Sequence, residues 1–246
     1  MDPTRSEHTR AALSQARAGG HLAPLEDSDI PCNLFDAYAI SFAQMKSIAA
    51  WKIGGANPWS RRVFNNKDSF IGPLHPDELF LETSSVPVSH LNAPMAEPEI
   101  MLELTSSDSA GRNMEFSRMA IGFEIPASVL PEVLKSSLNG QIADRAGAGA
   151  LWIAGITTFD RTVLQQEFSS RTWRNGMEIS PGSSTNLPDG PLGAAEEFLR
   201  IAADIGAPLL PGQWVATGGL SPAVAVAAGD SMRVSALEWD VTLTLS

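Results

Sequence analysis

The pattern of apolar and polar residues predicts helices near the start of the chain and strands over most of the rest. Apolar side chains at helical spacing predict a helix over residues 5–18, which Gly19-Gly20 ends, and a second over 34–51. A third helix is predicted over 190–203. Strands are predicted where short apolar runs lie between turn residues, at 70–74, 79–81, 97–104, 119–125, 151–155, 213–217, 223–226, 232–234 and 241–245.

Two further segments are predicted from their polar and turn-forming residues. The stretch 162–176 is expected to contain paired strands that meet at an Asn175-Gly176 turn. Residues 57–68 are polar, basic for this chain and rich in turn formers, so we expect a loop or a lid. Its cationic side chains could meet an anionic ligand or simply face water; they are Arg61, Arg62 and Lys67.

The predicted strand 97–104 begins with two glutamates on either side of a proline. Residues two apart in a strand point to the same face, so Glu97 and Glu99 would place two carboxylates side by side. Like charges this close raise each other's pKa unless a cation or a donor lies between them. A hard divalent cation such as Mg²⁺ or Mn²⁺ would fit, since it prefers oxygen ligands. The alternative is a half-exposed strand whose polar face meets water.

Two other charged residues lie within apolar segments. Lys52, between Trp51 and Ile53, either extends along apolar neighbours to reach water or projects from a strand into a polar pocket. Glu124, between Phe123 and Ile125, is either exposed at a strand edge or buried with a partner, because an unpaired buried charge is costly.

Composition excludes several classes of protein. The chain has 246 residues, 43% of them hydrophobic, which suits one large or two small globular domains. The net charge of −11, without a basic block, argues against a nucleic-acid partner. A single cysteine, Cys32, excludes an intrachain disulfide, and the four histidines lack metal-ligand spacing. Neither a secretory signal nor a membrane span is visible, so we expect a cytoplasmic protein.

Several motifs, in the same order along the chain, resemble those of the 2-keto-4-pentenoate hydratase and 2-oxo-hepta-3-ene-1,7-dioate hydratase group. This group belongs to the fumarylacetoacetate hydrolase superfamily. Each motif is weak alone, but their shared order covers most of the chain. The matching segments are 21–27, 36–40, Trp51-Lys52-Ile53-Gly54, Gly72-Pro73-Leu74, Ala96-Glu97-Pro98-Glu99-Ile100, Phe123-Glu124-Ile125, Ile142-Ala143-Asp144 and 206–230.

The resemblance implies a fold and an assembly. The fold class would be α+β, with a mixed β-roll core like that of fumarylacetoacetate hydrolase. Residues 1–56 would form an N-terminal helical portion that packs on a catalytic domain of residues 57–246. Relatives in the superfamily usually assemble as dimers or larger oligomers, so a homo-oligomer is expected.

The resemblance also implies a site and a reaction. Glu97, Glu99 and Glu124 would hold Mg²⁺ or Mn²⁺, which would act as a Lewis acid on a small-molecule 2-oxo acid and stabilise an enolate. Lys52 would supply positive charge or a proton, and Thr217 would donate a hydrogen bond to the substrate carboxylate. The expected activity is that of a lyase, most simply the hydration of a 2-oxo-alkenoate.

The chain departs from the hydratase pattern in ways that keep other activities open. Arg145 replaces a usual asparagine and could bind a carboxylate if it faces the pocket. Segment 187–191 lacks a usual histidine, and the interval from Glu99 to Glu124 is short. Decarboxylation or tautomerisation of a 2-oxo acid would not require activated water. C–C bond hydrolysis would require it, with His75 as the candidate histidine. A non-catalytic scaffold subunit is the remaining alternative.

Overall fold

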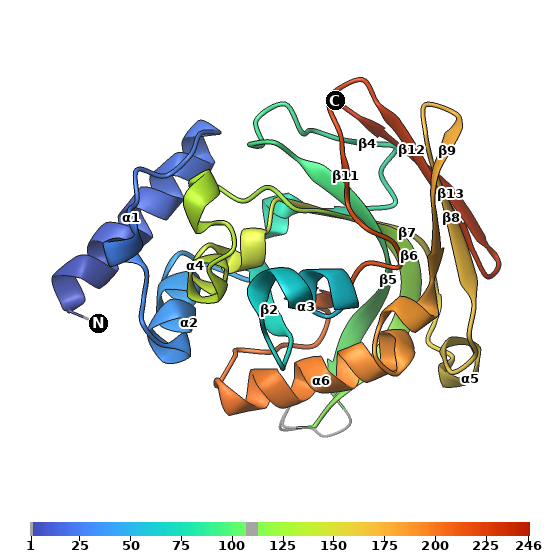
Figure 1. The fold of residues 1–246 in the computed structure, drawn as a ribbon. Coiled ribbons are helices and arrows are strands. Elements are labelled where there is room, and N and C mark those ends of the chain that lie inside the picture. The colour runs from blue at the N-terminus through green and yellow to red at the C-terminus, as the bar shows by residue number, and fades with distance from the viewer. Residues whose placement is uncertain (1, 107–112) are drawn as a thin grey trace.

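Two mixed β-sheets form the body of the molecule (Figure 1). The computed structural model describes residues 2–106 and 113–246. Within these ranges the helices are α1 (Pro3–Gly19), α2 (Leu34–Ala43), α3 (Pro58–Phe64), α4 (Leu138–Ala143), α5 (Arg161–Leu164) and α6 (Gly190–Asp204). Helices α1, α2 and α4 lie at the left in this view, α3 and α6 lie in front and below, and α5 lies beside the smaller sheet. Short 3₁₀ segments include η2 (Pro76–Glu78), η3 (Glu132–Leu134) and η4 (Arg145–Gly147). The predicted α+β class is confirmed.

The larger sheet has eight described strands and brings distant parts of the chain together. Its order is β2-β1-β10-β5-β6-β7-β3, with β11 beside β5. The bounds are β1 (Ala50–Gly54), β2 (Phe70–Leu74), β3 (Leu79–Leu81), β5 (Met95–Ser106), β6 (Met114–Ile125), β7 (Ala150–Thr158), β10 (Trp214–Ala216) and β11 (Val224–Ala225). The β1–β10 and β3–β7 pairs are parallel, so the sheet is mixed as expected.

The smaller sheet packs against the larger one. Its order is β4-β13-β12-β8-β9, with bounds β4 (Ser85–Val86), β8 (Ser169–Arg174), β9 (Met177–Ser183), β12 (Ser231–Ala236) and β13 (Trp239–Leu245). The predicted turn at Asn175-Gly176 joins β8 to β9. Val234 and Leu243 of this sheet share a buried cluster with Phe123 and Trp152 of the larger sheet. This cluster holds the smaller sheet against one face of the larger sheet.

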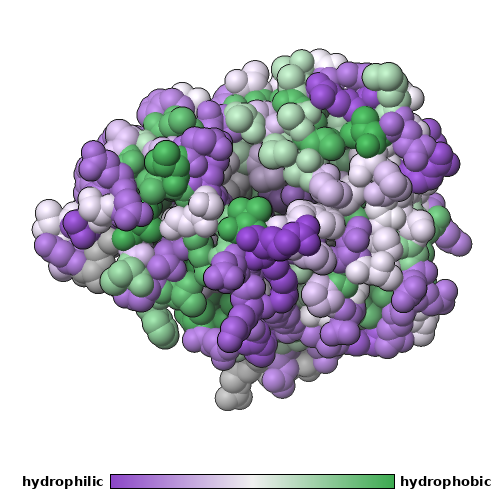
Figure 2. Space-filling model, in the orientation of Figure 1, coloured by the Kyte–Doolittle hydropathy of each residue, from purple (hydrophilic) through white to green (hydrophobic). Residues whose placement is uncertain are grey.

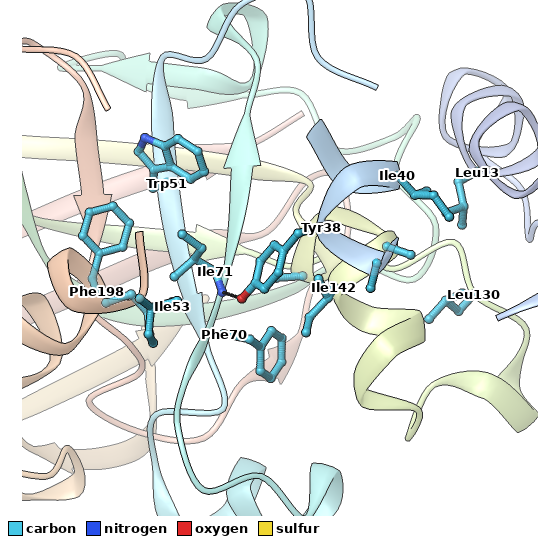
Figure 3. Close-up of a cluster of buried hydrophobic side chains, with 14 of the residues drawn as sticks. Leu13, Tyr38, Ile40, Trp51, Ile53, Phe70, Ile71, Leu130, Ile142 and Phe198 are labelled. Atoms are coloured by element: carbon cyan, nitrogen blue, oxygen red, sulfur yellow. Dashed lines mark hydrogen bonds between the residues drawn. The ribbon is translucent and has the colours of Figure 1, made fainter. Parts of the chain in front are cut away.

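A second buried cluster joins the helices to the larger sheet (Figure 3). The ring of Trp51 on β1 lies 6.1 Å from that of Phe198 on α6. The hydroxyl of Tyr38 on α2 accepts a hydrogen bond of 3.2 Å from the backbone N–H of Ile71 on β2. These contacts hold β1 and β2 between α2 and α6, and they therefore fix the direction in which the side chains of β1 point.

The prediction of one helix over residues 34–51 is wrong in its second half. The helix ends at Ala43, and Ala50–Gly54 is β1, paired with both β2 and β10. Pairing on both edges and full burial of Trp51 outweigh the helical tendency of the preceding residues. The domain division at residue 56 stays a prediction, although β1 itself lies within the larger sheet.

The prediction of a loop over residues 57–68 is also corrected. Pro58–Phe64 is a helical segment, α3, capped by Asn57, whose side chain accepts a 3.1 Å bond from the N–H of Ser60. Asparagine at the N-cap followed by proline at the first helical position is a helix-start signal. The remainder, after Phe64, is irregular up to Phe70.

No helix in the part of the chain that the structure describes is both long enough and apolar enough to span a bilayer. The small polar residues of 105–112 also predict a loop, but Thr105 and Ser106 continue β5, and residues 107–112 lie outside the described residues.

Candidate metal centre

Strand register places four charged side chains on one face of the larger sheet. Glu97 lies directly opposite Glu124 in the antiparallel β5–β6 pair, and Glu99, two residues along, shares their face. Lys52 of β1 aligns with Ala216 of β10. Ala216 in turn aligns with β5, on the face that carries the glutamates. The alanine methyl group is small enough for the lysine to reach across β10, which explains how residues from three segments of the chain meet.

The side chains that share this face are in close contact. Ligand oxygens of Glu97, Glu99 and Glu124 lie within 4.8 Å of one another, the only such group of metal-ligating side chains among the described residues. The Lys52 Nζ lies 2.9 Å from Glu124 Oε2. Glu99 and Glu124 are each 1% exposed, whereas Glu97 is partly exposed. The structure therefore brings Lys52 and all three predicted metal ligands together.

The segment after β10 completes the enclosure of the carboxylates. The backbone N–H of Gly218 donates a 2.6 Å hydrogen bond to Glu99 Oε2. A Cβ atom at Gly219 would lie 2.8 Å from Glu97 Oε2, so only glycine leaves room for that carboxylate. The Gly218-Gly219 pair is thus part of the site because it supplies a donor and a close backbone approach.

Burial and mutual repulsion raise the pKa of each carboxyl group in the cluster. Burial first, and then the charge of Glu124, raise the pKa of Glu97 to about 7. The pKa of Glu99 is raised well above its usual value by burial and by the charges of Glu124 and Glu97. Burial also raises the pKa of Glu124, which Lys52 lowers only in part. Burial lowers the pKa of Lys52, but the nearby glutamates outweigh this and raise it overall.

The donor set fits a hard divalent cation. Three carboxyl groups face one ammonium group, so the site would carry an excess of negative charge if all three were ionised, and the raised pKa values reflect that cost. A bound cation would neutralise the excess and favour the ionised carboxylates. The buried Oε1 of Glu124 has no hydrogen-bond partner in the structure, which leaves one carboxylate oxygen free to bind a ligand. Oxygen-only ligands are those that Mg²⁺ and Mn²⁺ prefer.

A cavity of about 280 Å³ opens next to the carboxylates, and Lys52 and Glu97 contribute to its lining. Figure 2 shows this face of the molecule hollowed near its centre, above α3. Apart from three glycines, the other lining residues have either apolar or polar side chains. The apolar ones are Ile53, Ala56, Phe64, Phe70, Ala93, Met95, Pro126 and Ala146; the polar ones are Asn57, Ser60, Asn92, Ser128, Lys135 and Gln141.

Two residues predicted to act in catalysis do not line this cavity. Thr217 is fully buried, and its hydroxyl donates a 2.9 Å hydrogen bond to the carbonyl of Ile100 on β5. Arg145 directs its guanidinium to Glu78, on the far side of the η4 backbone from the cavity. His75 lies in that second cavity as well. The roles assigned to Thr217 and Arg145 therefore gain no support from where their side chains lie.

The cavity also lacks one of the basic side chains of segment 57–68 and two large buried tryptophans. Arg61 donates to the carbonyls of Ala56 and Lys67 and pairs with Glu197, so it ties α3 down instead of facing the cavity. Trp51 and Trp152 are buried in the core and do not shape the cavity.

Sequence reasoning missed the cavity's polar lining. Asn57 alone carried a signal, as the N-cap of a helix that begins Asn-Pro. Ser128, Lys135 and Gln141 come from irregular segments and from α4, and no motif in the sequence marks them as neighbours of β5.

Comparison with known proteins identifies relatives along nearly the whole chain. No family model matches the sequence. A 2-keto-4-pentenoate hydratase from Paraburkholderia xenovorans (strain LB400) is 26% identical over 250 residues, which covers 94% of this chain and 90% of that protein. The resemblance to this group of hydratases is confirmed.

Solved structures share the fold. A 4-oxalocrotonate decarboxylase from Pseudomonas putida G7, complexed with magnesium and adipate, superimposes with a TM-score of 0.85 at 19% identity and covers 100% of this chain and 99% of its own. A fumarylpyruvate hydrolase from Pseudomonas aeruginosa, in complex with Mn²⁺ and pyruvate, gives 0.59 at 11% identity, covering 80% and 88%. The expected fumarylacetoacetate hydrolase-like fold is confirmed.

Proposed function

We propose that this chain is a divalent-metal-dependent lyase that hydrates a 2-oxo-alkenoate. The observation that carries the proposal is the buried cluster of Glu97, Glu99 and Glu124, with a free carboxylate oxygen, beside a cavity of suitable size for a small acid. The hydratase relatives support the reaction class, and the metal-bound structures of the same fold support the cofactor. The three glutamates would hold Mg²⁺ or Mn²⁺, which supplies Lewis acidity toward the oxygens of a 2-oxo acid.

Lys52 supplies a proton and a positive charge in this account. Its Nζ is 2.9 Å from Glu124 and borders the cavity, and the surrounding carboxylates raise its pKa, so the group is an ammonium at neutral pH. An ammonium at the cavity can stabilise enolate charge and donate a proton to a substrate carbon or oxygen. Protonation of a dienol in this way gives an electrophilic alkene to which water adds.

The cavity lining orients the substrate and limits access of water. Asn92, Ser128 and Gln141 contribute polar groups to the lining. Phe64 and Phe70, whose rings are 5.2 Å apart, contribute an apolar surface. An apolar wall beside a few polar groups suits an alkenoate chain that ends in a 2-oxo acid.

Decarboxylation or tautomerisation of a 2-oxo acid is the second candidate. The described residues that line the cavity include no histidine, and His75 faces a different cavity. A reaction without activated water does not need such a base. The same absence weighs against C–C bond hydrolysis.

The test uses purified protein with Mg²⁺ or Mn²⁺ and 2-keto-4-pentenoate in its dienol form. We expect loss of dienol absorbance and a product heavier by one water. Glu97→Ala, Glu99→Ala and Glu124→Ala should each abolish this metal-dependent turnover. Release of carbon dioxide from a 2-oxo diacid, without hydration, would favour the second candidate, and full activity in all three variants would contradict the metal site. Metal binding without turnover of any such acid would favour the scaffold alternative.

Two expectations accompany this proposal. A cytoplasmic location and assembly into a homo-oligomer, both expected from the sequence and its resemblance, stay predictions.

A further inference from the structure

The segment η4 forms part of the cavity wall and has an uncommon backbone conformation. Arg145, Ala146 and Gly147 have φ angles of 54°, 56° and 70°, so three consecutive residues lie in the left-handed region. A side chain disfavours this region, and of the three only the glycine avoids the penalty. Ala146 and Gly147 line the cavity. Strain of this kind persists only where surrounding contacts enforce it, so the structure should contain those contacts.

The first such contact is a buried ion pair behind the wall. The Nη1 and Nη2 of Arg145 donate to Oε2 and Oε1 of Glu78 at 2.8 and 2.7 Å, and the arginine side chain is 1% exposed. The backbone N–H of His75 donates to the same carboxylate at 2.8 Å. A bidentate pair fixes the guanidinium in direction as well as in position. The backbone of Arg145 is held accordingly.

Two more contacts hold the flanks of the turn. Asp144 accepts hydrogen bonds from Arg17, from Ser128 Oγ at 2.8 Å and from the N–H of Val129 at 3.0 Å. On the other flank, a Cβ atom at Gly72 of β2 would lie 2.0 Å from the carbonyl oxygen of Arg145. The turn is therefore enclosed between β2 and the Asp144 network. The N–H of Ala127 also donates to the carbonyl of Gly147 at 2.8 Å, and the Glu78 pair is the contact that holds the Arg145 side chain.

We propose that the Glu78–Arg145 pair positions the left-handed turn 145–147 and thereby sets the cavity wall against which the chain of the substrate lies. Neither side chain lines the cavity, so both act through the backbone of Ala146 and Gly147 and are positioning residues. The inference rests on the proposed function only in taking this cavity as the place where the substrate binds.

Amide hydrogen exchange tests the support of the turn without any ligand. The N–H groups of Gly147 and Ala148 close the turn on the carbonyls of Asp144 and Arg145, at 2.9 and 3.1 Å. Glu78→Gln keeps the shape but removes the charge, and Arg145→Lys keeps the charge but removes the fork. Each should speed exchange at these two amides about tenfold. Unchanged exchange in both variants would overturn the proposal.

A matched control separates this local effect from general loosening. Glu103→Gln breaks another bidentate pair, with Arg118, which is 47% exposed and does not line the cavity, and this variant should leave exchange at Gly147 and Ala148 unchanged. The N–H of Thr217, bonded to Ile100 in the core, reports opening of the whole sheet. Equal acceleration at Thr217 and at the turn would mean that Glu78 merely stabilises the fold, against the proposal.

Ligand binding tests whether the Glu78–Arg145 pair affects how the cavity wall contacts the chain of a bound acid. With Mn²⁺ present, Glu78→Gln should bind 2-oxopentanoate about tenfold more weakly than the wild type. It should bind oxalate, which has no chain to meet the wall, equally well. Equal affinity for 2-oxopentanoate would overturn the positioning role. A wild-type protein that binds neither acid would instead contradict the proposed function, and the exchange result would still decide whether the pair holds the turn.

Discussion

At the scale of single residues, the site depends on Lys52 being buried among three carboxylates. Its contact of 2.9 Å with Glu124 satisfies one oxygen of that glutamate and leaves the other without a partner. Lysine thus balances part of the negative charge and keeps a proton next to the cavity. A cation would complete the balance.

Lys52→Met should separate metal binding from chemistry. Removal of the ammonium leaves the carboxylates more negative, so Mn²⁺ affinity should be retained or increased. The loss of the proton donor should lower kcat by about 10²- to 10⁴-fold. Isothermal calorimetry and steady-state kinetics measure the two effects. The control Lys67→Met alters an exposed lysine outside the cavity lining and should change neither, whereas full activity of Lys52→Met would remove Lys52 from the mechanism.

At the scale of elements, the site is a product of strand pairing and one tight connection. The register Glu97 to Glu124 aligns two carboxylates of the cluster across β5 and β6, and the third follows from alternation along β5. The connection after β10 approaches so closely that Gly218 donates to Glu99 and Gly219 contacts Glu97. Backbone proximity, as much as the carboxylates themselves, defines the ligand geometry.

Gly219→Ala should weaken metal binding. Its Cβ would lie 2.8 Å from Glu97 Oε2, so the carboxylate must move away from the cluster. We expect the Kd for Mn²⁺ to rise about tenfold, as measured by calorimetry. Gly176→Ala is the control, because its φ of 78° strains an added side chain, but nothing lies within 4 Å of the methyl group and the β8–β9 turn is not part of the site. It therefore separates a local backbone cost from an effect on the carboxylates. Equal Kd values for both variants and the wild type would show that the connection does not shape the ligand set.

The sequence was sufficient to predict which residues share a face of one strand, but not how the strands are ordered in the sheet. Alternation around Pro98 predicted that Glu97 and Glu99 share a face, because strand geometry has a fixed period of two. The local pattern could not predict that β10 lies between β1 and β5, because the order of strands in a sheet depends on packing over the whole chain. The direction of Arg145 could not be predicted either, because no local pattern signals its left-handed φ of 54° or its pairing with Glu78. The helix α3, by contrast, was signalled by Asn57-Pro58 and overlooked.

At the scale of the whole molecule, two hydrophobic clusters hold the larger sheet on both sides. One joins it to α2 and α6, and the other joins it to the smaller sheet. Phe198 of α6 is fully buried against Trp51, next in sequence to Lys52. The position of Lys52 therefore depends on the core that the helices complete.

Phe198→Ala should destabilise the protein without touching the site directly. A large buried side chain lost from a packed core costs about 3–5 kcal/mol. Urea unfolding should show this decrease in the free energy of unfolding. Phe35→Ala, at a side chain that is 76% exposed, should change it by less than about 0.5 kcal/mol. Equal stabilities would mean that α6 does not contribute to the core as described.

The central claim is that Glu97, Glu99 and Glu124 form a divalent metal centre to which a 2-oxo acid binds. Calorimetric titration of oxalate, a mimic of the enolate, tests it most directly, with and without Mn²⁺, in the wild type and in Glu124→Ala. The account predicts that oxalate binds the wild type only when Mn²⁺ is present and does not bind the variant under either condition. Oxalate binding that is independent of Mn²⁺, or that survives in Glu124→Ala, would contradict it.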